Sequence, residues 1–532
     1  ATQTTPTTTT TPTPTKTTPT TTTPTTTTPT TTDTTPTSTT PTTTTPTTTD
    51  TTPTTTTPTT TDTTPTSTTA APAPSTYFGF NDNAVGFGQT TAATDASLAA
   101  QIGANTSRVT LDWRYAEPTQ GTWKLSSYDA IYTQDLAKGI RPVFILLFSP
   151  QWAFADPTVC SDTVQSCRYP PGPTHLDAWR DAVTKLVTRY PQMAALEVWN
   201  EPNLASFWKG GLDPAYYTTL LGEAYNAAHA AGSSVPILGG ALSNYTDPDS
   251  ATAMNYRSYL KGMYTAGAKG KMDGLSLHPY PDDIDLWRIF KTLTEVRDIR
   301  DANGDSTPLW LTEAGVTTSA PGSNYTFNEN DQALMLRKIY SELTAMKDVR
   351  ATILHTLIDP SVFATTSAEY GYGTMHVDLS PKPAFCALAA ARGTTYSCPS
   401  TVAPLTDMPT QQLRWAAQDY VQAAADAARV WYRTHNTYVG LDPTQLHAID
   451  PTLSATGADQ ALLPGATADP SRVGVWVWGT AGAENLLLCN TSKADRSYCI
   501  ETQAGNQWVY GKAEGNVNAA AGATSNGSIW WW

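Results

Sequence analysis

The chain has 532 residues, and its 46 Asp and Glu against 32 Lys and Arg give a formal net charge of −14. This acidic balance argues against nucleic acid and anionic membranes as partners, because both attract cationic proteins. No apolar run approaches the roughly 18 residues of a membrane-spanning helix, so no span is predicted.

Residues 1–75 consist almost entirely of Thr and Pro. Such a segment has too little apolar surface to offset the entropy of ordering, so we predict a disordered, extended stalk. A dense run of hydroxyl groups with Pro resembles O-glycosylated stalks, and an unmodified spacer is the alternative.

Residues 76–400 alternate between strand-like apolar runs and amphipathic helical stretches. The predicted strands are Tyr77–Asn81, Ser107–Trp113, Pro142–Ser149, Ala195–Asn200, Pro236–Leu242, Gly274–Pro279, Leu309–Glu313 and Ala351–Ile358. Helical patterns between them include Leu176–Arg189, Pro214–Ala231 and Asn328–Met346. Eight β-then-α units predict an α/β fold, a (β/α)8 TIM barrel. A doubly wound open sheet is the alternative, which lacks support because no Gly-rich phosphate loop follows the first strand.

Residues 401–532 are predicted to form a separate small α+β domain. A helix is expected from about Thr410 to Thr434, because apolar and small side chains recur on one face. Short strands are expected at Val473–Trp478, Leu486–Cys489, Tyr498–Glu501 and Gln507–Tyr510.

The six cysteines fall into three pairs that are close in sequence: Cys160 with Cys167, Cys386 with Cys398, and Cys489 with Cys499. An even count with local spacing predicts three disulfides and an oxidising, extracellular compartment. No pair has the spacing of a zinc motif, so no metal site is predicted.

Two predicted barrel strands end in a glutamate. The fourth runs into Trp199-Asn200-Glu201-Pro202-Asn203, and the seventh into Thr312-Glu313-Ala314-Gly315. The carboxyl ends of all strands of a TIM barrel lie on one face, so Glu201 and Glu313 are expected to meet there. Two facing carboxyl groups are what glycoside hydrolysis requires.

These motifs resemble the paired signatures of glycoside hydrolase clan A. With Leu277-His278-Pro279-Tyr280 and Ser380-Pro381-Lys382-Pro383-Ala384-Phe385, they are most similar to family 39 and its bacterial endoglycosidase relatives. The resemblance implies a retaining enzyme that cleaves a polysaccharide by double displacement, without a cofactor. Glu201 would be the acid/base and Glu313 the nucleophile.

The same resemblance assigns supporting residues. Asn200 would hydrogen-bond the sugar 2-hydroxyl, Arg108 would keep Glu313 ionised, and Tyr280 would donate a hydrogen bond to Glu313. His278 would line the same floor. For Arg108 the alternative is a structural ion pair elsewhere, and for His278 a core histidine satisfied by the backbone.

The sequence leaves alternative roles open for the aromatic residues expected near the site. Trp152 is expected either to stack on a sugar or to pack within the barrel wall. His355 stands where many clan members carry the Trp or Tyr that forms a sugar platform, so a more polar innermost subsite is expected. An aromatic residue of the loop Ser361–Tyr372 is expected to replace that platform. The Cys160–Cys167 loop either shapes a cleft wall or is simply stabilised by its disulfide.

The C-terminal domain resembles the globular head of type IV pilins over 426–441 and 446–451, where a helix leads into a loop and a sheet. It lacks the apolar helix by which pilins polymerise, so we expect a docking domain for a cell-surface or filament partner. The terminal Trp530, Trp531 and Trp532 are either a glycan or partner contact or a sheet edge.

The sequence supports two alternative functions. The first is an extracellular or cell-surface retaining glycosidase, and a transglycosylase would share its site. The second is a non-catalytic adhesin or filament protein that binds glycan on a glycosylated stalk. The intact set of Glu201, Glu313, Asn200 and Tyr280 favours the first, and the stalk and pilin-like domain favour the second.

Overall fold

The computed structural model describes residues 74–81, 84–160, 167–319, 327–455, 474–480, 483–491, 496–503, 507–514 and 530–531. The predicted stalk lies outside the described residues, apart from its last two positions. Within the part of the chain that the structure describes, no helix is both long and apolar enough to cross a bilayer.

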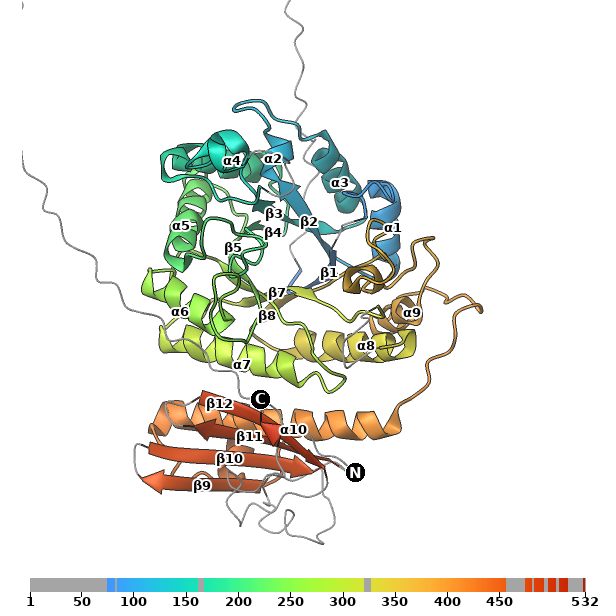
Figure 1. Cartoon of the computed structure of the whole chain (residues 1–532). Helices are drawn as coiled ribbons and strands as arrows, with labels where there is room; N and C mark the ends of the chain where they lie inside the picture. The colour runs from blue at the N-terminus through green and yellow to red at the C-terminus, as the bar shows by residue number, and fades with distance from the viewer. Residues whose placement is uncertain are drawn as a thin grey trace, which may run out of the picture. The chain divides into compact units, whose positions relative to one another are not determined.

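Eight parallel strands close into a barrel in sequence order, with β1 paired to β8 (Figure 1). The strands are β1 (Tyr77–Asn81), β2 (Thr106–Asp112), β3 (Arg141–Leu147), β4 (Ala195–Val198), β5 (Ile237–Ser243), β6 (Gly274–His278), β7 (Leu309–Ala314) and β8 (Val349–Leu354). The predicted TIM barrel is confirmed, and the open-sheet alternative is wrong because β1 pairs with both β2 and β8.

Helices surround the barrel (Figure 1). They are α1 (Ala92–Gln101), α2 (Trp113–Ala116), α3 (Ser126–Ala137), α4 (Leu176–Arg189), α5 (Pro214–Ala230), α6 (Tyr256–Thr265), α7 (Trp287–Ala302), α8 (Glu329–Ala345) and α9 (Pro383–Ala391). Side-chain hydrogen bonds cap the first residues of several of these helices. Asn328 and Asp331 form a capping box at α8, and Asp213 caps α5 directly before Pro214.

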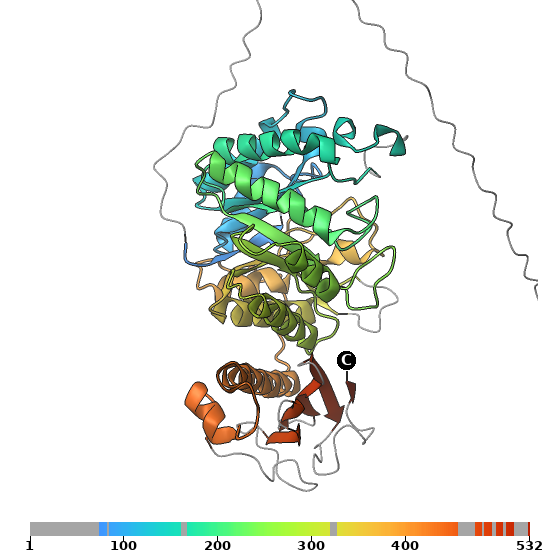
Figure 2. The same ribbon diagram turned by 90° about the vertical axis from the view of Figure 1, so that its left-hand side faces the viewer.

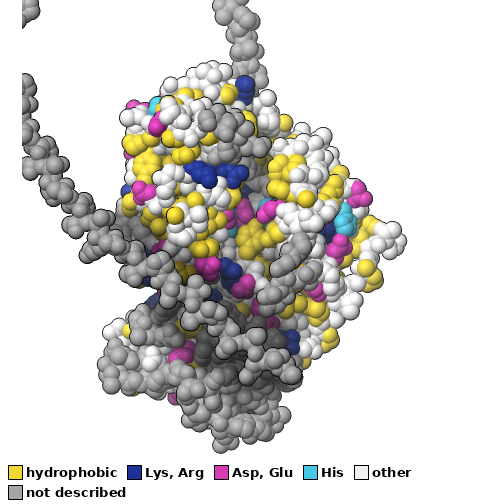
Figure 3. Space-filling view, in the orientation of Figure 1, with side chains coloured by type: hydrophobic (Ala, Val, Ile, Leu, Met, Phe, Trp, Pro, Cys, Tyr) yellow, Lys and Arg dark blue, Asp and Glu magenta, His cyan; other side chains and the backbone are white. Residues whose placement is uncertain are grey.

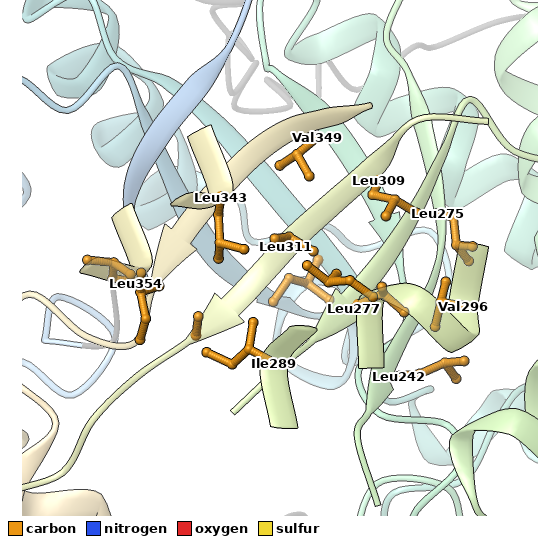
Figure 4. Close-up of a cluster of buried hydrophobic side chains, with 14 of the residues drawn as sticks. Leu242, Leu275, Leu277, Ile289, Val296, Leu309, Leu311, Leu343, Val349 and Leu354 are labelled. Atoms are coloured by element: carbon orange, nitrogen blue, oxygen red, sulfur yellow. The ribbon is translucent and has the colours of Figure 1, made fainter. Parts of the chain in front are cut away.

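Apolar side chains fill the layer between the strands and these helices. Figure 4 shows leucines of β6 and β7 facing side chains of α7 and α8, all of them buried. A second cluster lies inside the barrel and includes Tyr77, whose ring stacks on that of Trp310 at 5.4 Å. Filling on both sides of the strands makes the barrel a rigid frame for residues at the strand ends.

Three predicted strand ends need correction, and the first is that of β3, which ends at Leu147 and not at Ser149. β4 ends at Val198, before the predicted Asn200, because Trp199 has a positive φ of 70° and leaves the extended conformation. β8 covers Val349–Leu354 and not 351–358, and His355 to Ile358 lie in the loop that follows. The site residues Asn200 and His355 therefore lie just beyond strands, on turns.

The C-terminal domain has a 27-residue helix, α10 (Pro409–His435), a short α11 (Pro443–Ile449) and a five-stranded antiparallel sheet. The strands are β9 (Gly474–Thr480), β10 (Ala483–Thr491), β11 (Arg496–Gln503), β12 (Gln507–Glu514) and β13 (Trp530–Trp531). Figure 2 shows α10 along one face of this sheet. An α+β domain is confirmed, and Trp530–Trp531 form an edge strand on β12, as in the sheet-edge alternative given for the terminal tryptophans.

All three expected disulfides are present. Cys160 is bonded to Cys167, Cys386 to Cys398, and Cys489 to Cys499, the last pair joining neighbouring strands β10 and β11. No free cysteine occurs in the described part of the chain.

The C-terminal helix packs on the barrel through polar and aromatic contacts with α7 and the loop before it. The indole of Trp415 donates to the carbonyl of Ile284 at 2.8 Å, and Gln411 donates to Asp285 at 2.9 Å. The ring of Trp287, at the start of α7, meets Tyr510 of β12 edge-on at 4.9 Å. These buried contacts join the two domains.

Candidate active site

The candidate site lies at the carboxyl ends of the barrel strands. The turn after β4 carries Asn200 and Glu201, and both Trp199 and Glu201 have a positive φ, of 70° and 41°. Such values are unfavourable for residues with a side chain, and strained residues of this kind cluster at functional sites. The amide of Glu201 donates to the carbonyl of Ala241 at 3.0 Å, which fixes the turn.

Arg108, on β2, is the centre of the polar network. Its side chain is 2 % exposed, and each of its five N–H groups has an acceptor. The acceptors are Oε2 of Glu197 (2.7 Å), Oε1 of Glu313, Oδ1 of Asn81 (3.3 Å), Oδ1 of Asn200 (2.9 Å) and Nε2 of His278 (3.2 Å). One guanidinium thus fixes residues from β1, β2, β4, β6 and β7 relative to each other.

Glu313 is held as a carboxylate. Burial raises the pKa of its carboxyl group, but the charged Arg108 guanidinium and the Tyr280 hydroxyl lower it, and the net pKa lies below the usual range. The Tyr280 hydroxyl donates to Oε2 at 2.8 Å. A carboxylate held as an anion can act as a nucleophile.

Gly315 lets the chain after β7 pass close to the backbone of His355. A Cβ atom at this position would lie 2.5 Å from the carbonyl oxygen of His355 and 3.2 Å from the ring of Tyr280. The same Cβ would lie 2.9 Å from the ring of Tyr372, so any side chain would press on three residues of the site.

Glu201 is contacted by a histidine whose protonation pattern can be inferred. Arg108 can only donate, so Nε2 of His278 must accept, and the ring proton lies on Nδ1. Nδ1 then donates to Oε1 of Glu201 at 3.0 Å. One oxygen from each of Glu201 and Glu313 lies within 4.8 Å of the other.

Glu201, His278 and Glu313 are close enough to one another to be considered as metal ligands. A histidine binds a metal through a nitrogen lone pair, and Nδ1 carries a proton while Nε2 accepts from Arg108. The donor set therefore does not fit a metal ion.

His355 extends the network away from Glu313. Its Nδ1 accepts from the Asn81 amide at 3.0 Å, and its Nε2 lies 3.3 Å from Oε2 of Glu369. The ring of Tyr372 lies 5.1 Å from His355 and 5.6 Å from Tyr280, edge-on to both. Tyr372 is thus the aromatic residue of the 361–372 loop that the structure places in the site.

Other candidates lie further out. Trp152 is half-buried, donates to the carbonyl of Glu117 at 3.1 Å and meets Trp113 edge-on at 5.6 Å. These are contacts of the barrel wall. Phe363 is 38 % exposed and contacts Phe87.

Three residues of the network were not expected from the sequence. Glu197 lies within β4, Asn81 ends β1, and Glu369 lies in the loop after β8. A charged residue inside an otherwise apolar strand, as in Leu196-Glu197-Val198, was the available signal for Glu197.

No protein-family model matches the chain, and no curated protein sequence matches it. Among solved structures, the chain is similar to a family 39 glycoside hydrolase from the gut symbiont Bacteroides cellulosilyticus, with 20% identity, 60% of this chain and 64% of that chain covered, and a TM-score of 0.45.

Two further structures are similar. One is the GH39 enzyme from Xanthomonas axonopodis pv. citri (19% identity, 59% and 66% covered, TM-score 0.43). The other is a monomeric beta-xylosidase from Caulobacter crescentus (18% identity, 58% and 66% covered, TM-score 0.42). The chain spans less than two thirds of each of these three proteins.

Proposed function

We propose that the protein is a retaining glycoside hydrolase of clan A, most like family 39, with Glu201 as acid/base and Glu313 as nucleophile. The observation that carries this proposal is the unequal environment of two carboxyl groups within 4.8 Å of each other. Glu313 is fixed as an anion by Arg108 and Tyr280. Glu201 receives one neutral N–H and keeps its other oxygen available for a proton.

The reaction has two steps. In the first, a Glu313 oxygen attacks the anomeric carbon, and Glu201 gives its proton to the departing glycosidic oxygen. In the second, Glu201 takes a proton from water, whose oxygen attacks the same carbon and displaces Glu313. Two inversions restore the starting configuration, and carboxyl groups about 5 Å apart suit this route because no water fits between them in the first step.

Asn200 supports the same reaction. Its Oδ1 accepts from Arg108, so its amide N–H groups are left to donate to a sugar hydroxyl. A donor fixed beside the anomeric carbon stabilises charge that develops in the transition state. The three disulfides support an extracellular or cell-surface location, where the stalk and C-terminal domain would display the enzyme.

The experiment is hydrolysis of β-linked polysaccharides and aryl glycosides by wild type, Glu201→Ala and Glu313→Ala, with azide added to each. We expect azide to restore Glu201→Ala by giving the azide of retained configuration, and Glu313→Ala by giving the inverted azide. Cleavage that survives Glu313→Ala without azide would contradict the assignment. If no glycan is cleaved but one binds equally to all three proteins, the barrel is a non-catalytic binding platform.

A further inference from the structure

Arg168 lies beside the loop that carries the candidate acid/base. It follows Cys167, and its Nη1 donates to the carbonyl of Ser206 at 3.0 Å. Ser206 belongs to the same short loop as Glu201, whose carbonyl accepts from the amide of Leu204. Arg168 therefore joins the loop after β3 to the loop after β4.

The Arg168 guanidinium rests on aromatic rings that lead to the site. Its central carbon lies 5.1 Å from the ring of Phe148 and 5.2 Å from that of Phe207, and these rings are parallel. Phe148 in turn meets Trp199, the residue before Asn200, edge-on at 5.8 Å. Rings on both neighbouring loops hold the guanidinium in one orientation close to the candidate site.

The group formed by Arg168, Arg114 and Asp112 carries more positive than negative charge. Arg114 lies 4.6 Å from the same Phe148 ring and pairs with Asp112 through two hydrogen bonds, of 2.9 and 2.6 Å. Across the described residues, no carboxylate lies within ion-pair distance of Arg168, and its Nε is buried without an acceptor. Burial and the nearby Arg114 charge lower the pKa of Arg168, and Asp112, the carboxylate that raises it, is already paired with Arg114.

A ligand can reach the guanidinium group of Arg168. Arg168 and its neighbours Tyr169 and Lys209 are partly exposed. Figure 3 shows a group of Lys and Arg side chains in front of β3 and β4, next to the acidic and histidine side chains at the centre of the barrel face. In a chain of net charge −14, a local positive excess beside the cleft attracts an anion that the rest of the surface repels.

We propose that Arg168 binds the carboxylate of a uronic acid in the substrate, so that the preferred glycan is acidic. This inference rests on the proposed function. A planar guanidinium pairs with a planar carboxylate through two hydrogen bonds; Arg168 has one Nη1–H bonded to Ser206, and its Nη2, unlike its Nε, is not among the buried unpaired atoms, so the other Nη1–H and Nη2 are left for a carboxylate. The alternative is that Arg168 only clamps the two loops together.

Binding can be measured without turnover by calorimetry on the full-length Glu313→Gln protein. The probes are polygalacturonate and glucuronoxylan, each beside its carboxyl-reduced, neutral form. We expect the better acidic glycan to bind at least tenfold more tightly than its reduced form, with affinity falling as salt rises. Adding Arg168→Gln should weaken acidic binding about 10- to 100-fold and leave the reduced form unaffected.

Arg350→Gln is the matched control. Its guanidinium is also half-buried over an aromatic ring, 5.1 Å from Tyr77, but it lies at the opposite end of the barrel. We expect no change in binding. Arg168→Lys keeps the charge and loses the paired hydrogen bonds. Its affinity for the acidic glycan should therefore fall between those of Glu313→Gln alone and of the protein with Arg168→Gln added. This variant keeps the test valid if Arg168→Gln does not fold.

Two outcomes would overturn the inference. In the first, acidic and reduced glycans bind alike. In the second, Arg168→Gln weakens both equally, as a loop clamp would. The two proposals fail separately: salt-dependent acidic binding without hydrolysis would refute only the catalytic function, and hydrolysis of acidic glycans that is unchanged by Arg168→Gln would refute only this inference.

Discussion

Tyr280 and Arg108 each bind a different carboxylate oxygen of Glu313. The hydroxyl donates to Oε2 at 2.8 Å, while Arg108 donates to Oε1. The two donors come from β2 and from the loop after β6, on opposite sides of the barrel. With both oxygens held, the carboxylate cannot rotate, so it is fixed in the orientation needed for attack on an anomeric carbon.

Tyr280→Phe should therefore weaken the proposed nucleophile, Glu313, without removing it. Loss of a hydrogen bond to a charged group costs about 1.5–3 kcal/mol, so kcat/KM should fall about 10- to 100-fold. The Tyr280 hydroxyl lowers the pKa of Glu313, so its removal raises that pKa. Glu313 acts as an anion, so the acid limb of the kcat/KM profile can move only toward higher pH.

Steady-state kinetics from pH 3 to 8 with aryl glycosides of good and poor leaving groups provide the check. The loss should be similar for both substrates, because attack by Glu313 is common to them. A shift of the acid limb to lower pH would contradict the role given to Tyr280.

His278 should act on the other carboxyl group. Its Nδ1–H donates to Oε1 of Glu201, so His278→Ala frees the candidate acid to rotate. Protonation matters most when the leaving group is poor. We expect a loss of about tenfold or more with an alkyl glycoside and little loss with a dinitrophenyl glycoside. Equal losses with the alkyl and the dinitrophenyl glycoside would indicate that His278 acts on Glu313 and not on Glu201.

Much of the fold was predictable because a barrel repeats one simple pattern. Each β-strand is an apolar run buried on both faces, such as the predicted and observed β1 at Tyr77–Asn81. The two glutamates were also predictable, since strand ends share one face whatever the loops do. Their detailed roles remain predictions until the variants are measured.

The remaining contacts depend on distances that sequence does not contain. Glu197 and Asn81 meet Arg108 only because β4 and β1 close on either side of the barrel interior. Glu369 reaches His355 from a loop, and loop paths have no sequence period. The end of β4 was placed too late because the positive φ of Trp199 is imposed by the fold and not by its residue type.

Arg108 should support stability as well as geometry. Arg108→Met leaves Glu197 buried without its ion pair and Glu313 without one of its donors. Removal of one partner from a buried pair costs about 3–5 kcal/mol, so the urea midpoint should fall sharply. Adding Glu197→Gln removes one uncompensated charge and should recover part of the loss. Additive losses in this double-mutant cycle would argue against the pair.

A pH-dependent contribution to stability is expected where α10 meets α8. Burial raises the pKa of Asp419 from 3.8 to about 6, despite its ion pair with Lys338. One of its carboxylate oxygens is buried without a partner. The folded state therefore binds this proton more tightly than the unfolded state does. The stability is fully present below about pH 4 and is lost as pH rises through 6.

Asp419→Asn removes that titration. The shift of about two units would correspond to about 3 kcal/mol, but the side chain is 34 % exposed, so solvent screening reduces the expected effect to about 1 kcal/mol. Lys338 keeps Glu342 as a partner at 2.9 Å. In urea unfolding, the free energy of the variant relative to wild type should rise by about 1 kcal/mol between pH 4 and pH 7. A difference that stays constant or falls over this interval would show that the ion pair with Lys338 outweighs the burial of Asp419.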